Sequence, residues 1–86
     1  MAEQTTLQRA RLRWRARRGM LENDLILTRF LDRYEAELTD ADVAALNQLF
    51  KMDDNDLLQV LLANQEPQAP YDSPDIQRLV ALMRAL

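Results

Sequence analysis

The side chains best suited to chemistry are arginines concentrated near the amino-terminal end. Six of the eleven basic residues fall within ten positions: Arg9, Arg11, Arg13, Arg15, Arg17 and Arg18. A guanidinium group stays charged and can donate two parallel hydrogen bonds to a carboxylate or a phosphate. The lone glycine, Gly19, and the acidic Glu22 follow directly. These residue types at this spacing indicate recognition of an anionic group rather than catalysis.

The composition excludes most kinds of catalytic centre. The chain has no cysteine and no histidine, so it lacks thiolate nucleophiles, disulfides, Cys/His zinc sites and the commonest general base near neutral pH. The acidic residues 53–56 lack the glycine and the distal glutamate of a calcium-binding loop. We therefore predict no catalytic residue, no metal ligand and no enzymatic activity.

Charge is unevenly distributed along the chain. The formal net charge is −3 although the arginine-rich stretch is strongly basic, so the remainder is distinctly acidic. Such a stretch can bind nucleic acid, an anionic cofactor or an acidic protein surface. Because the acidic remainder repels nucleic acid, nucleic-acid binding is the weaker alternative.

Hydropathy favours a cytoplasmic protein. No apolar run approaches the roughly 20 residues needed to span a bilayer, and arginines stand where a signal peptide has its apolar stretch. Glu3 and the scarcity of serine argue against a mitochondrial leader. We expect a monomeric bacterial cytoplasmic protein that does not insert into membranes.

The elements that position the arginine-rich segment are predicted to be helices. The chain has one glycine, three prolines and 48% hydrophobic residues, with leucine the most frequent, a composition that favours helix over sheet. Apolar residues recur at i, i+3, i+4 and i+7, the period of an amphipathic helix. The prediction is an all-α, single-domain, five-helix bundle with helices over 6–17, 21–37, 40–51, 54–64 and 74–85, and a linker over 66–72.

Helix boundaries are marked by capping residues. Gly19 suits a left-handed cap after the first helix, and Thr39 followed by Asp42 suits a capping box for the third. An aspartate, Asp53 or Asp54, can cap the fourth helix. Ser73 followed by proline is a strong start signal for the fifth.

The first helix is expected to bury one face. Leu7, Ala10 and Trp14 fall at i, i+3 and i+7, so this spacing predicts that they face the core while the arginines surround them. Trp14 is therefore expected to be a core residue. Tyr71, in the linker, is expected to cover the end of the bundle.

A family resemblance rests on the segment from Trp14 to Asp24. Its sequence Trp-Arg-Ala-Arg-Arg-Gly-Met-Leu-Glu-Asn-Asp resembles the signature of SdhE-type FAD assembly factors, whose central pattern is Arg-Gly-x-x-Glu preceded by further arginine. The likeness continues through 30–34, 38–40, 56–58 and 66–67, which is most of the chain from about Leu12 onward. Members often carry a leucine at the position of Asn23.

The resemblance implies a function and a site. Such factors are five-helix bundles that bind the flavoprotein subunit of succinate dehydrogenase, or of fumarate reductase, and promote covalent attachment of FAD to a histidine of that client. No cofactor is expected to be tightly bound, because the factor acts on the client's FAD. The partner-binding residues implied are Arg18, Gly19 and Glu22, bordered by Arg17, Met20 and Asp24.

Simpler interpretations remain open for the same residues. Gly19 can be only a helix cap, the arginines only a solvated face, and Glu22 an ordinary first-turn acid. An alternative function is an antitoxin-like regulatory module that binds a different protein.

Overall fold

The computed structural model describes residues 2–17 and 19–86, and the side chains of these except for residues 2–6 and 8. The described chain contains five α-helices and one 3₁₀ turn, and no strand. The elements are α1 (Ala2–Ala16), α2 (Leu21–Tyr34), η1 (Glu35–Glu37), α3 (Asp40–Leu49), α4 (Asp54–Leu61) and α5 (Pro74–Arg84). The prediction of an all-α five-helix bundle is confirmed.

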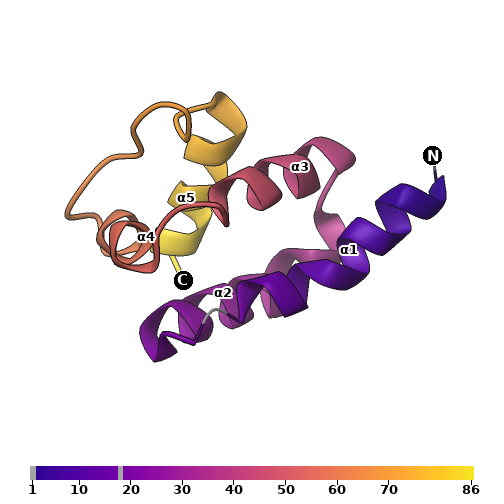
Figure 1. Ribbon diagram of the computed structural model, residues 1–86, viewed down its shortest axis with the longest axis horizontal. Coiled ribbons are helices and arrows are strands. Elements are labelled where there is room, and N and C mark those ends of the chain that lie inside the picture. The colour runs from indigo at the N-terminus through magenta and orange to yellow at the C-terminus, as the bar shows by residue number, and fades with distance from the viewer. Residues whose placement is uncertain (1, 18) are drawn as a thin grey trace.

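The five helices pack against one another around one core. In Figure 1, α1 and α2 run antiparallel, side by side, and α3 packs on α1. α5 packs against α2, α3 and α4, and α4 also packs on α2. The short connection between α1 and α2 therefore lies at one end of the antiparallel pair, where it is open to solvent.

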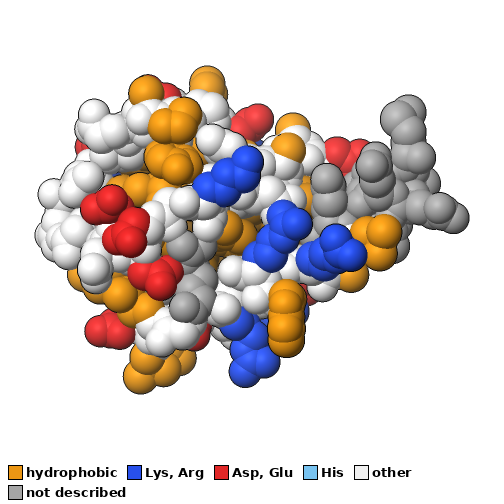
Figure 2. Space-filling view, in the orientation of Figure 1, with side chains coloured by type: hydrophobic (Ala, Val, Ile, Leu, Met, Phe, Trp, Pro, Cys, Tyr) orange, Lys and Arg blue, Asp and Glu red, His pale blue; other side chains and the backbone are white. Residues whose placement is uncertain are grey.

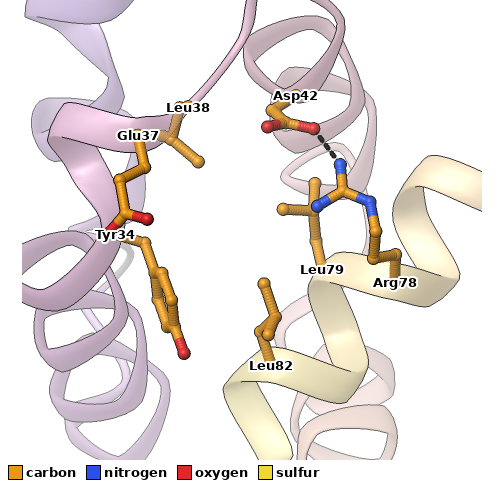
Figure 3. A pocket seen from close by; sticks show the side chains of 7 residues that line it. All are labelled: Tyr34, Glu37, Leu38, Asp42, Arg78, Leu79 and Leu82. Atoms are coloured by element: carbon orange, nitrogen blue, oxygen red, sulfur yellow. Dashed lines mark hydrogen bonds and ion pairs between the residues drawn. The ribbon is translucent and has the colours of Figure 1, made fainter.

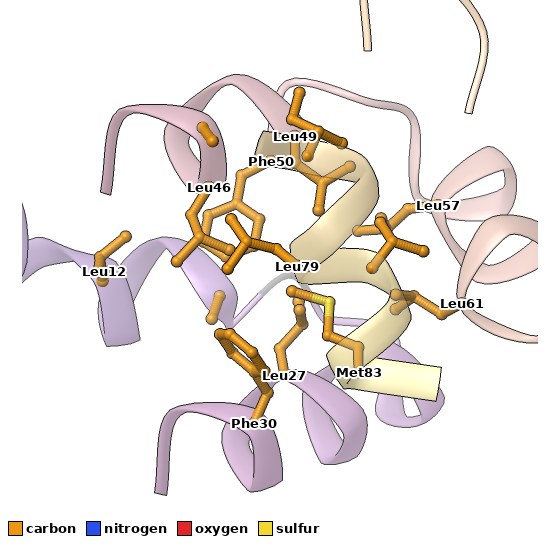
Figure 4. Close-up of a cluster of buried hydrophobic side chains, with 14 of the residues drawn as sticks. Leu12, Leu27, Phe30, Leu46, Leu49, Phe50, Leu57, Leu61, Leu79 and Met83 are labelled. Carbon is orange, nitrogen blue, oxygen red and sulfur yellow. The ribbon is translucent and has the colours of Figure 1, made fainter. Parts of the chain in front are cut away.

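The core is a single cluster of apolar side chains contributed by all five helices (Figure 4). Its fully buried members include Leu12 of α1, Phe30 of α2, Leu46 of α3, Leu57 of α4 and Leu79 of α5. Burying a leucine or phenylalanine contributes about 1.5–3 kcal/mol each. Burial of this one cluster thus accounts for a stable domain without disulfides or metal.

The helix starts follow the predicted caps. Thr39 Oγ1 accepts from the Asp42 N–H at 3.1 Å and Asp42 Oδ2 accepts from the Thr39 N–H at 3.0 Å, so the predicted capping box is present. The Asp53 side chain caps α4. The Ser73 side chain caps α5, in which proline takes the first position. Local sequence therefore determines where these helices begin.

Some helix ends differ from the predicted ranges. α1 begins at Ala2 rather than near residue 6, because the alanine, glutamate and glutamine of its first turn are good helix formers. α2 ends at Tyr34, and η1 tightens the following turn. α4 ends at Leu61 because Ala63, with φ of +63°, reverses the chain. The predicted segments 35–37 and 62–64 are therefore not α-helix.

The linker is held by one arginine of α5. Arg84 donates from Nε to the Val60 carbonyl oxygen at 2.8 Å and from Nη2 to the Gln65 carbonyl oxygen at 3.0 Å. It also pairs with Glu66 at 3.2 Å. Tyr71 is half-buried against the core, in agreement with its predicted role as a cover.

Asp42 connects α3 to α5 through an ion pair with Arg78 (Figure 3). The pair borders a pocket of about 160 Å³. Tyr34 lies on the other side of this pocket in Figure 3, while Leu82 lies on α5 below the ion pair. Burial by itself raises the pKa of Asp42, but hydrogen bonds from the Thr39 N–H and from Arg78 outweigh it and lower that pKa below its ordinary value. Asp42 is therefore a charged group inside the bundle.

The predicted inner face of α1 is wrong. Trp14 is 75% exposed, Leu7 is 53% exposed and Ala10 is exposed, whereas Leu12 and Ala16 are buried. Both sets of residues fit a helical period, so periodicity alone cannot choose between them. With Leu12 and Ala16 inward, Arg9 reaches the Leu38 carbonyl oxygen and Asp40, and Arg13 reaches Asp32 and Glu35.

Candidate functional site

The candidate site is the turn that joins α1 to α2. The Arg17 N–H donates to the Trp14 carbonyl oxygen at 3.3 Å, which closes the last turn of α1. Met20 has extended backbone, with φ of −101° and ψ of 114°, and its carbonyl oxygen accepts from the Asp24 N–H at 2.9 Å. α2 thus starts only five residues after α1 ends.

Gly19 gives this turn its shape. Its φ is +90°, a left-handed backbone conformation that L-residues rarely adopt. An added Cβ would meet no heavy atom within 4 Å, and the residue is exposed. Glycine is therefore required here for the backbone conformation, as the predicted cap implies, and the space above it is open to a partner.

The other predicted site residues differ in exposure. Arg17 and Glu22 are exposed, whereas Met20 and Asp24 are half-buried. Glu22 and Asp24 lie in the first turn of α2, where negative charge is favoured by the helix dipole. Arg18 lies outside the described residues, and so does its predicted pairing with Glu22. The structure thus brings Arg17, Gly19 and Glu22 to one exposed end of the bundle.

Two shallow hollows adjoin Arg17. One, of about 280 Å³, is lined by Arg13, Arg17, Thr28 and Leu31. The other, of about 310 Å³, is lined by Trp14 and Arg17. The first is thus bordered by residues of both α1 and α2, and the second adjoins the exposed Trp14. The Arg17 side chain therefore stands between two places where a partner can make contact.

The arginines of α1, and Arg17 just after it, differ in whether they are ion-paired. Arg9 and Arg13 are ion-paired with carboxylates of the bundle, and the hydrogen bond to Asp32 raises the pKa of Arg13 above its ordinary value. Arg11 and Arg17 are exposed and form no ion pair with any side chain in the described part of the chain. Arg15 is exposed as well and donates to the neutral Asn47 Oδ1 at 2.7 Å. Arg11, Arg15 and Arg17 are therefore the ones that present charge to a partner.

Asn23 is a feature of the site that sequence reasoning did not assign. It is fully buried, and its Nδ2 donates to the Asp54 carbonyl oxygen at 2.9 Å, which ties the start of α2 to the start of α4. Its Oδ1 has no hydrogen-bond partner among the described residues. The sequence does hold a signal for this burial. Asn23 lies four positions before Leu27, and that spacing places it on the same inner face of the helix.

The chemistry available at this end of the bundle is binding. Guanidinium, carboxylate and open backbone are exposed there, and the described residues contain no group of three or more acidic, His or Cys side chains placed to hold a metal ion. Within the same residues, no helix is long and apolar enough to cross a membrane. Fold and surface together define a small helical protein with an exposed turn that carries recognition groups.

Comparison with known proteins assigns the family. The model of the family described as "flavinator of succinate dehydrogenase" matches residues 10–86. The chain belongs to this family of assembly factors, as the signature between Trp14 and Asp24 predicted.

Individual relatives agree with the family match. A protein of Ralstonia nicotianae named FAD assembly factor SdhE is 57% identical over 79 residues, which cover 92% of this chain and 83% of the relative. A protein of Pseudomonas aeruginosa with the same name is 32% identical over 83 residues, or 96% and 92% of the two chains. No solved structure matched.

Proposed function

We propose that this chain binds the flavoprotein subunit of succinate dehydrogenase and thereby promotes covalent attachment of FAD to that subunit. The observation that carries the proposal is the exposed turn at Gly19, which combines open backbone with the exposed side chains of Arg17 and Glu22. The flavoprotein subunit of fumarate reductase is the second client in this proposal.

The proposed contact involves Arg17 and Glu22 on the rim of the turn, with Gly19 at its centre. Arg18, which the family signature implies, is proposed to take part as well. A guanidinium recognises a client carboxylate, or a phosphate of the client's FAD, through two parallel hydrogen bonds that lysine cannot reproduce. Glu22 accepts hydrogen bonds from client donors. Met20 and Asp24, which are half-buried, support the backbone of the turn.

The proposed mechanism is stabilisation of a client conformation. In this mechanism the client contributes both its FAD and the histidine that becomes linked to it, so the factor needs no nucleophile or base of its own. The chain without His or Cys acts by raising the population of the arrangement in which these groups are close.

In this proposal the factor acts as a monomer and holds no FAD tightly by itself. The hollows beside Arg17 are shallow and about 300 Å³ each. Sites for drug-sized ligands occupy about 300–1,000 Å³, and FAD is larger than most such ligands. This size supports FAD remaining with the client.

The function is tested by expressing the flavoprotein subunit in cells that lack their own assembly factor, with and without this chain. Covalent flavin is read as in-gel fluorescence of the denatured subunit. We expect fluorescence to rise strongly when the chain is present. Equal fluorescence with and without it would remove the proposal, and co-purification of a toxin-like protein instead would favour the antitoxin alternative.

The site is tested with Arg18→Ala and Glu22→Ala. Hydrogen bonds to charged groups contribute about 1.5–3 kcal/mol, so each variant should bind the client roughly tenfold or more weakly and give less covalent flavin. The melting temperature of Glu22→Ala should stay close to that of the unmodified chain, because Glu22 is exposed.

Arg33→Ala is the matched control for this test. Arg33 is also exposed on α2 but lies in its last turn, away from Gly19. It should leave client binding unchanged. Loss of helical content in Glu22→Ala would show that the residue is structural, and normal flavinylation in both site variants would rule out the assigned residues.

A further inference from the structure

α1 carries an apolar stripe on the side opposite the core. Leu7, Ala10 and Trp14 share one face of the helix at i, i+3 and i+7, and all three are exposed. Trp14, the only tryptophan, is 75% exposed. Tryptophan is enriched at the energetic centres of protein interfaces, because enclosing it removes about 150–250 Å² from water. An outward indole on a rigid helix therefore indicates a contact surface.

Unneutralised charge flanks this stripe on both sides. Arg11 lies on one side and Arg17 on the other, and neither forms an ion pair with a side chain in the described ranges. Basic side chains gather over α1 in Figure 2, with apolar side chains beside them. Arg9 and Arg13, by contrast, are directed toward the bundle by their carboxylate partners. The outer face is thus complementary to an acidic surface that has an apolar pocket.

The stripe is continuous with the turn at Gly19. The Trp14 carbonyl oxygen accepts from the Arg17 N–H, and the side chains of Trp14 and Arg17 line the same hollow of about 310 Å³. A partner that contacts Arg17 and Gly19 therefore lies within reach of the indole without any change in this chain.

We propose that the outer face of α1, formed by Leu7, Ala10, Arg11 and Trp14 and extended by Arg17 just after the helix, is a second contact surface for the client flavoprotein. This inference rests on the function proposed above. Trp14 enters an apolar pocket of the client, and carboxylates at the rim of that pocket pair with Arg11 and Arg17.

Charge and shape argue against other occupants. A symmetric contact between two copies of this chain would bring their unneutralised arginines together, which costs free energy. A helix that lies in a membrane interface buries a broad apolar face, whereas this stripe has only two large side chains, Leu7 and Trp14. An acidic protein surface satisfies both the arginines and the indole.

The test compares Trp14→Ala with Leu62→Ala, a control that truncates another exposed apolar side chain, 52% exposed at the end of α4. Binding to the purified flavoprotein subunit, produced without covalent flavin, is measured by calorimetry. Trp14→Ala should weaken binding roughly tenfold or more, as loss of an aromatic anchor does, and Leu62→Ala should not. Circular dichroism should show both variants folded.

Arg11→Glu is a second variant that does not depend on truncating the indole. It should weaken client binding and make the remaining affinity less sensitive to salt, because one attraction becomes a repulsion. If the unmodified chain binds the client and both variants bind equally well, the inference is wrong while the proposed function stands. If the unmodified chain does not bind the client, both are wrong.

Two further measurements identify a different occupant. Co-sedimentation with phosphatidylglycerol vesicles that Trp14→Ala abolishes, with client binding unchanged, would make the stripe a membrane contact. A dimer in analytical ultracentrifugation that Trp14→Ala dissociates, with client binding unchanged, would make it a self-association surface. Either result would overturn the inference.

Discussion

Single residues in the connection between α1 and α2 have unequal roles. Gly19 supplies a backbone conformation that other residues reach only at a cost, and Asn23 anchors the start of α2 to the Asp54 carbonyl oxygen. The side chains of Arg17 and Glu22, by contrast, are exposed. Residues that hold the turn are thus distinct from residues that can meet a partner.

Gly19→Ala should lower the free energy of unfolding. A residue with a Cβ costs roughly 1–2 kcal/mol in the left-handed region, and no neighbouring atom adds a clash, since none lies within 4 Å of the added Cβ. Urea denaturation measures the loss. Gly19→Asn should lose less, because asparagine tolerates positive φ. Equal stability of Gly19→Ala and the unmodified chain would show that the turn does not need this conformation.

Among the helices, α4 ends in a way that departs from the usual residue choice. The Ala63 N–H donates to the Val60 carbonyl oxygen at 3.1 Å and the Asn64 N–H to the Gln59 carbonyl oxygen at 2.9 Å, the two hydrogen bonds of a Schellman motif. The left-handed position of this motif is normally glycine, but here it is Ala63 with φ of +63°. The end of α4 therefore holds backbone strain.

Ala63→Gly should relieve that strain and raise the free energy of unfolding by about 1 kcal/mol. The same substitution at Ala44, an exposed position within α3, is the matched control and should lower it by about 1 kcal/mol. Thermal or urea unfolding measures both. A loss of stability in both variants would contradict the assigned conformation of Ala63.

At the scale of the whole molecule, the bundle is stabilised by one apolar core and by a charged contact between helices. Asp42 is 5% exposed, completes the capping box of α3 and pairs with Arg78 of α5. Removing one partner of such a buried network leaves other polar groups unsatisfied, at about 1–3 kcal/mol each. The contact therefore links the stability of the bundle to pH.

The stability of the bundle should fall in acid, in part through Asp42. Its pKa is lower in the folded state than in the unfolded state, so this contribution is complete above the ordinary aspartate pKa of about 3.9. It is lost as the pH falls through the folded-state value. Denaturation between pH 7 and pH 3 should show a smaller decline for Asp42→Asn, which is also less stable at pH 7.

Asp72→Asn, at an exposed position in the linker, is the control for this pH dependence. It should follow the unmodified chain at every pH, because the change lies outside the α3–α5 contact. If Asp42→Asn declines in acid as steeply as the unmodified chain, the carboxylate of Asp42 does not couple stability to pH.

The helical class, the capping box at Thr39, the cap at Ser73 and the left-handed turn at Gly19 could all be predicted from local sequence. These features depend on residues within about four positions of one another, so local hydrogen bonding and backbone preference decide them. The signature from Trp14 to Asp24 also identified the family before any geometry was known. The roles of Arg17, Arg18 and Glu22 in binding stay predictions.

The rotation of α1 about its own axis, by contrast, depends on contacts with distant segments of the chain. Two sets of apolar residues on that helix fit the same period. Leu12 and Ala16 are the set that faces the core, and in this rotation Arg9 and Arg13 reach carboxylates of other segments. These contacts join residues 19 to 31 positions apart in the sequence, so no local pattern contains them. The same rotation turned Trp14 from an expected core residue into an exposed one.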